Sequence, residues 1–71
     1  MFRIQVEYQG EIYHLNKTYS SGEIGNRIGL INVNENFTEY ENMEAANEAI
    51  ETFNRSNHHQ RLENIEIIEV Q

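Results

Sequence analysis

The sequence predicts a small α+β protein, in which an antiparallel sheet of three or four strands carries one amphipathic helix on one face. Residues 2–8 alternate apolar and polar side chains, which is the period of a half-buried strand. Residues 42–54 repeat apolar side chains at spacings of three and four, which is the period of a helix. The predicted order is β-β-β-α-β. Residues 1–71 are expected to form a single compact domain, because no linker or internal repeat divides them.

The first two strands are predicted to form a hairpin, Phe2–Tyr8 and Glu11–Lys17, joined by a two-residue turn at Gln9-Gly10. Such a turn fixes the register, and the expected pairs are Tyr8 with Glu11, Val6 with Tyr13, Ile4 with Leu15 and Phe2 with Lys17. One face then holds Ile4, Val6, Tyr13 and Leu15. The other holds Arg3, Gln5, Ile12 and His14. The hairpin therefore separates an apolar face from a mixed one.

The middle of the chain carries weaker signals. Thr18–Gly29 contains three glycines, which disfavour a helix, so it is predicted as a loop with one turn around Ile24 as the alternative. Ile28–Val33 is β-branched and is predicted as a third strand, whose core-facing residues are Ile28, Leu30 and Val33. Phe37–Tyr40 is either a short extended segment or the lead into the helix.

The helix is predicted at Asn42–Asn54, with Asn42 as its N-cap. A start at Thr38, where Thr38-Glu39-Tyr40-Glu41 fits a capping box, is the alternative. The apolar stripe consists of Met43, Ala46, Ala49, Ile50 and Phe53. The opposite side carries Glu41, Glu44, Glu48 and Glu51 within an arc of roughly 80°. About three turns of helix are marginal alone in water, so the stripe must be held against a sheet.

Asn54–Arg61 is polar and aperiodic and is predicted as a loop, which leads into a last strand at Leu62–Val70. In that strand Ile65 and Ile67 share one face, whereas Ile68 and Val70 share the other. The apolar pattern therefore changes parity at Ile67-Ile68. This predicts a bulge at that point, or a strand that is covered on both faces.

Charge and composition restrict the kinds of partner that the protein is expected to bind. All 12 acidic residues are Glu, against five Lys plus Arg, so the formal net charge is −7. This balance repels phosphate and argues against direct nucleic-acid binding. No apolar run approaches the length of about 18 residues that a membrane span needs, and no secretion signal is evident. The absence of cysteine is typical of a reducing compartment, so we expect a cytoplasmic protein with no membrane partner.

The sequence predicts no catalytic residues, no metal and no cofactor. Its histidines, His14, His58 and His59, lack the spacing of a metal site, and we expect one on a strand surface and two in a loop. A zinc site that includes Glu63 is the alternative. No Gly-x-Ser-x-Gly elbow accompanies the serines, and no Asp is present to orient a histidine. We therefore expect a protein that is not an enzyme.

Helix stability does not explain the acidic side of the helix, because Glu44 and Glu48 are like charges four residues apart. The four glutamates are either a solubilising face or a docking surface for a protein partner with a basic surface. Successive glutamates rise by about 4.5–6 Å along the helix, comparable with the phosphate spacing of one nucleic-acid strand. The candidate surface is extended by Glu63, Glu66 and Glu69, if the bulge turns Glu66 and Glu69 the same way.

In size, acidity, lack of a catalytic set and an asparagine-rich composition, the chain resembles the class of phage and mobile-element inhibitor proteins, which includes anti-CRISPR proteins and DNA mimics. The resemblance implies a protein that blocks a basic nucleic-acid-binding protein in the host cytoplasm, and charge geometry favours the Glu-rich helix face as the contact. The alternative is a structural or assembly protein that forms homodimers or larger homo-oligomers through a strand edge at Leu62–Val70, or through exposed Ile12 and Ile68.

Overall fold

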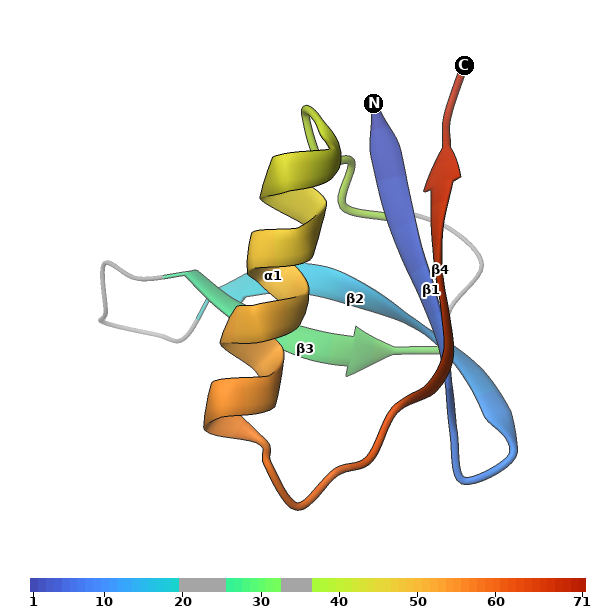
Figure 1. Ribbon diagram of the computed structural model, residues 1–71, viewed down its shortest axis with the longest axis vertical. Coiled ribbons are helices and arrows are strands. Elements are labelled where there is room, and N and C mark those ends of the chain that lie inside the picture. Colours follow the sequence, from blue (N-terminus) through green and yellow to red (C-terminus); the bar gives the residue numbers. More distant parts are fainter. Residues whose placement is uncertain (20–25, 33–36) are drawn as a thin grey trace.

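A computed structural model describes residues 1–19, 26–32 and 37–71 of the chain. Its elements are β1 (Phe2–Tyr8), β2 (Glu11–Tyr19), β3 (Asn26–Ile31), α1 (Met43–Ser56) and β4 (Glu63–Glu69). The strands form one antiparallel sheet in the order β3-β2-β1-β4, and α1 lies across one face of it (Figure 1). The predicted α+β fold and its element order are confirmed. We call the face of the sheet toward α1 the inner face, and the opposite face the outer face.

β1 and β2 form the predicted hairpin around Gln9-Gly10. The backbone φ angles are 51° at Gln9 and 81° at Gly10, and positive values at both positions are what a tight turn between twisted strands requires. The pairs Tyr8–Glu11 and Val6–Tyr13 are as predicted, and the pairing continues to Gln5–His14. The turn therefore fixes the register of the hairpin from Tyr8–Glu11 to Gln5–His14.

The predicted pair between Phe2 and Lys17 is wrong. Phe2 instead exchanges two backbone hydrogen bonds with Tyr40, at N–O distances of 2.8 and 2.6 Å. The Thr38 N–H donates to Asn16 Oδ1 at 3.1 Å, and the Lys17 N–H donates to Thr38 Oγ1 at 2.8 Å. The segment from residue 37 to residue 40 is therefore extended and hydrogen-bonded to β1 and β2. Thr38 does not start the helix.

β2 and β3 extend into the stretch that was predicted as a loop. β2 continues to Tyr19, β3 begins at Asn26, and their pairs run from His14–Ile31 to Tyr19–Asn26. Gly29 marks close packing instead of a loop, because a Cβ atom added there would lie 3.2 Å from Thr18 Cγ2. Ile28 and Leu30 pack against the core as predicted. The turn expected around Ile24 and the core position expected for Val33 lie outside the described residues.

The helix begins as predicted and ends two residues later. Asn42 is the N-cap, and its Oδ1 accepts a hydrogen bond from the Ala45 N–H at 2.8 Å. At the other end Asn57 caps the helix, because its backbone N–H and its side-chain amide both donate to the Phe53 carbonyl, at 2.9 and 3.1 Å. Both ends therefore gain hydrogen bonds for groups that helix geometry leaves unpaired.

Replacing Asn42 with alanine is expected to cost about 1 kcal/mol of folding free energy, because the first turn loses its side-chain acceptor. Urea denaturation measures the loss. Asn42→Ser, which keeps an acceptor, is the control and should retain most of the stability. A loss of less than about 0.3 kcal/mol for the alanine variant would show that the cap contributes little.

The apolar stripe of the helix is buried only in part. Ala46, Ala49 and Phe53 are buried and Ile50 is half-buried, but Met43 is 47% exposed. The expectation that Met43 is buried is therefore wrong. The physical reason is the placement of the helix: α1 packs on β1 and β3, whereas Met43 lies on the flank of the helix toward β4.

β4 contains a bulge, but not where the apolar pattern placed it. Ile67 pairs with Ile4 and Ile68 with Arg3 without interruption. The register shifts further back, between Glu66 and Glu63, so that Asn64 and Ile65 together oppose Val6. Asn64 has a φ of 48°, a conformation that asparagine tolerates better than most residues. The bulge is therefore centred on Asn64.

The core lies between α1 and the inner face of the sheet. Its buried apolar residues are Ile4, Val6, Leu15, Tyr40, Ala46, Ala49 and Phe53. Tyr40 was not predicted to belong to it. The Tyr40 hydroxyl donates to the Leu15 carbonyl at 2.9 Å, and burial raises the pKa of the Tyr40 phenol to about 12. The phenol therefore stays protonated and acts as a hydrogen-bond donor inside the core.

Candidate protein-binding surface

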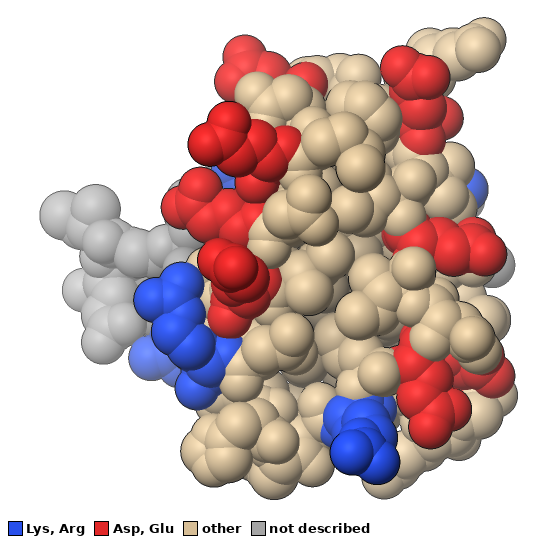
Figure 2. All heavy atoms as spheres, in the orientation of Figure 1, with Lys and Arg blue, Asp and Glu red and all other residues tan. Residues whose placement is uncertain are grey.

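The glutamates of α1 form a row on its outward side. Glu44, Glu48 and Glu51 are exposed, and within the described part of the chain none of their carboxylates makes a hydrogen bond or an ion pair. Figure 2 shows acidic side chains in a column along the helix. We call Glu44, Glu48 and Glu51 the helix row. Its charges are not used for internal stability, so they are available to a partner.

Glu41 does not belong to the helix row. It is exposed, but it precedes the N-cap Asn42, whose backbone is extended (φ −153°, ψ 175°). The arc that included Glu41 assumed a helical backbone at that residue. Glu41 therefore lies at the N-terminal approach to the helix, where its charge still suits the positive end of the helix dipole.

Basic residues lie on two sides of the helix row. Arg55 follows Glu51 by one turn, in the order that favours a pair within a helix. On the side toward β3, Glu48 and Lys17 line one groove of about 320 Å³, whose floor includes Ile28 and Ala49. The row is therefore an acidic strip with basic margins, and a partner must bring its positive charge to the outward side of α1.

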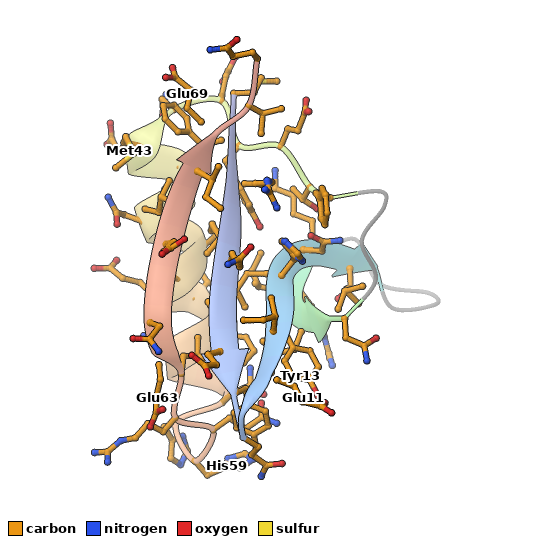
Figure 3. All side chains as sticks on the ribbon, turned by 90° about the vertical axis from the view of Figure 1, so that its right-hand side faces the viewer. Glu11, Tyr13, Met43, His59, Glu63 and Glu69 are labelled. Carbon is orange, nitrogen blue, oxygen red and sulfur yellow. The ribbon has the colours of Figure 1, made fainter. Side chains whose placement is uncertain are left out.

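The glutamates of β4 do not extend the helix row. Glu66 pairs with Gln5 and Glu63 with Glu7, which puts both on the outer face. Glu69 pairs with Phe2 and lies on the inner face at the far end of the strand (Figure 3). The bulge precedes Glu66, so it leaves Glu66 and Glu69 on opposite faces. The proposed extension through all three residues is wrong for this reason.

The outer face holds a cluster that the sequence did not reveal. His14 was expected on the strand surface, but it is only 4% exposed, because the Phe37 ring covers it at a centroid distance of 4.1 Å. Arg3 Nη1 lies 2.9 Å from His14 Nε2, and the Arg3 guanidinium lies 4.9 Å from the centroid of the Phe37 ring. Because Phe37 lies more than 20 residues along the chain from His14, no local sequence pattern reveals this contact.

The contact with Arg3 fixes the protonation state of His14. An arginine only donates, so His14 Nε2 accepts and the imidazole is neutral, with its proton on Nδ1. Burial lowers the pKa of His14, and the positive charge of Arg3 lowers it further. His14 Nδ1 is buried without a partner among the described residues. The cluster is therefore built around an uncharged histidine.

Acidification is expected to weaken the fold through His14. The unfolded chain binds a proton near pH 6.5 and the folded protein binds it only at lower pH, so stability falls as the pH drops below about 6.5. Thermal unfolding between pH 7.5 and 5.5 measures the slope. His14→Gln should flatten the slope, because the titrating imidazole is then absent. Equal slopes for the wild type and His14→Gln would contradict the assignment.

Across residues 1–19, 26–32 and 37–71, no three His, Cys, Asp or Glu side chains are placed to hold one metal ion. His58 and His59 contact each other edge to face, with ring centroids 5.8 Å apart. Within the same residues, no helix combines the length and the apolar character that crossing a bilayer requires.

Comparison with protein-family models, with curated proteins and with solved structures finds no match for this chain.

Proposed function

We propose that this protein is a non-enzymatic protein-binding module, and that it blocks a basic nucleic-acid-binding protein in the manner of phage or mobile-element inhibitors. The observation that supports the proposal is the helix row, Glu44, Glu48 and Glu51. These carboxylates are exposed and have no internal partner among the described residues. Like charges four residues apart do not stabilise a helix, so binding gives the row a use that folding does not.

The spacing of the row fits a surface that normally binds phosphates. Along the helix the three carboxylates are about 4.5–6 Å apart in rise, which is of the same order as the rise of about 3.4 Å per phosphate along one strand of a duplex. A net charge of −7 also accelerates the approach to a positively charged cleft at moderate salt. The protein would then compete with nucleic acid for the same cleft, and we place this encounter in the cytoplasm.

Competition tests the proposal. The protein is used as bait for the host proteins, and a captured partner is then bound to a fluorescent DNA or RNA oligonucleotide. Adding the protein should release the oligonucleotide with one-to-one stoichiometry. A partner that has no affinity for nucleic acid, or a stable ternary complex, would contradict the proposal.

Self-association is the second candidate function, and the sheet topology favours it. β3 and β4 are the edge strands of the sheet, and Ile12 on the outer face is 50% exposed. A homo-oligomer would use one of these surfaces instead of the helix row. Light scattering coupled to size exclusion separates the two candidates, because an apolar strand interface persists in high salt whereas contacts of the helix row weaken.

A further inference from the structure

A strip of apolar side chains lies between α1 and β4 on the inner face. α1 packs on β1 and β3, so the part of the sheet under β4 has less cover. Met43 is 47% exposed and Ile65 is 41% exposed. We call this strip the α1–β4 seam, and its residues are Met43, Ile50, Leu62, Ile65 and Ile67. Figure 2 shows an uncharged surface between the acidic column of the helix and the acidic side chains near β4.

The seam runs beside a free strand edge. β4 pairs with β1 on one side, and in the described part of the chain no strand pairs with its other side. An extended segment of another protein can add to such an edge through main-chain hydrogen bonds. At one end of the seam a hollow of about 310 Å³ lies beside Leu62 and Ile65, which gives room for an incoming side chain.

The side chains of β4 specify which segment fits. Residues that face each other across two strands lie on the same face of the sheet. On the inner face an added strand meets Ile65 and Ile67, so apolar residues fit there. On the outer face it meets Glu66 and, past the bulge, Glu63, so lysine or arginine fits there. Glu69 lies at the Met43 end and Arg61 lines the hollow at the other end, so basic residues are favoured near Glu69.

A second copy of the chain fits this edge poorly. Antiparallel pairing of β4 with β4 would bring Glu63, Glu66 and Glu69 of both copies together, and each copy carries a net charge of −7. Charged side chains on an edge strand are a known obstacle to edge-to-edge pairing. The same charges favour a basic segment. We therefore propose that the β4 edge and the α1–β4 seam bind an extended segment of a partner protein, in which apolar residues alternate with lysine or arginine.

This inference rests on the proposed protein-binding function, but it uses a different surface from the helix row. The probe is a fluorescent seven-residue peptide, the length of β4, in which lysine and valine alternate. Its control has the same composition with the lysines grouped at one end, so that charge is kept and alternation is lost. Fluorescence anisotropy measures affinity, and amide chemical shifts locate the site.

The alternating peptide should bind at least about fivefold more tightly than the grouped control and should shift the amides of β4 most. Ile65→Lys should lower the affinity for the alternating peptide by about tenfold, because the substitution puts a cation into the seam. Ile12→Lys, also at an exposed isoleucine but on the outer face near the hairpin turn, should change it less than twofold. Reversing Glu44 and Glu48 should change it less than about threefold, which separates this site from the helix row.

Equal affinity for both peptides would overturn the inference, as would shifts confined to α1 or an unchanged affinity in Ile65→Lys. A homodimer that Ile65→Lys dissociates would also overturn it, because the seam would then be occupied by a second copy. Failure of the peptide test while the helix row still binds its partner would leave the proposed function standing without this second site.

Discussion

Replacing Phe53 with alanine is expected to cost about 3–5 kcal/mol of folding free energy. Phe53 is the largest fully buried side chain of α1, at 2% exposure, and it packs with Ile4, Val6 and Leu15. A chain of 71 residues is expected to be stable by only about 4–11 kcal/mol in total. The substitution should therefore unfold much of the population at 37 °C. Urea denaturation followed by circular dichroism measures the loss.

Two controls separate core packing from a general effect of mutation. Phe53→Leu keeps most of the volume and should cost less than about 1.5 kcal/mol. Ile12→Ala removes an exposed side chain and should change the stability by less than about 0.5 kcal/mol. If Phe53→Ala lost less than about 1 kcal/mol, α1 would not be held by this contact, and the position of the helix row on the molecule would be in doubt.

Charge reversal of the helix row, in the triple variant Glu44→Lys, Glu48→Lys and Glu51→Lys, is expected to weaken binding to the proposed partner. The affinity should fall by at least about 100-fold, which is about 2.7 kcal/mol. Each reversal adds two units of charge, so the formal net charge changes from −7 to −1. The three side chains are exposed, so the fold should survive, and circular dichroism checks this. Calorimetric titration of the captured partner measures the affinity.

Salt provides an independent check on the same charges. The wild type should lose affinity steeply between 50 mM and 300 mM salt, because exposed charge pairs are screened over a Debye length of about 10 Å at 0.1 M. The triple variant should show a much flatter salt dependence. A triple variant that binds as tightly as the wild type, or a wild-type affinity that does not depend on salt, would contradict an electrostatic role for the helix row.

Local signals predicted much of this fold. The Gln9-Gly10 turn fixed the register of the hairpin near it, and Asn42 with the spacing of Ala46, Ile50 and Phe53 defined the start and the buried face of the helix. These features depend on residues that are close in sequence, so the pattern and the structure coincide. Further from the turn the predicted register is wrong, because Phe2 pairs with Tyr40, which is distant in sequence.

The features that were missed depend on contacts between distant segments. Tyr40 is buried in the core, where its hydroxyl donates a hydrogen bond to the Leu15 carbonyl, and the Phe37 ring covers His14. Neither contact could be predicted from the periodic pattern of apolar residues in the sequence. The bulge was misplaced for a similar reason: the apolar pattern locates a parity change at Ile67, whereas pairing with β1 puts the extra residue near Asn64. Pairing in three dimensions therefore overrides the one-dimensional pattern.

The candidate surface was predictable only where it lies on the helix. Glu44, Glu48 and Glu51 follow helical spacing, so their common side could be read from the sequence. The faces of Glu63, Glu66 and Glu69 depend on the register of β4 against β1, which the sequence does not encode locally. The seam between α1 and β4 also required the structure, because it arises from where the helix sits on the sheet.

The most direct test of the helix row compares two single reversals that change the net charge equally. The first variant is Glu48→Lys, in the middle of the helix row. The second is Glu11→Lys, and Glu11 lies at the hairpin turn, far from the helix row (Figure 3). Titration against the same partner at physiological salt should show a loss of about tenfold for Glu48→Lys and less than about twofold for Glu11→Lys. Equal losses for the two variants, or no loss for Glu48→Lys, would contradict binding through the outward side of α1.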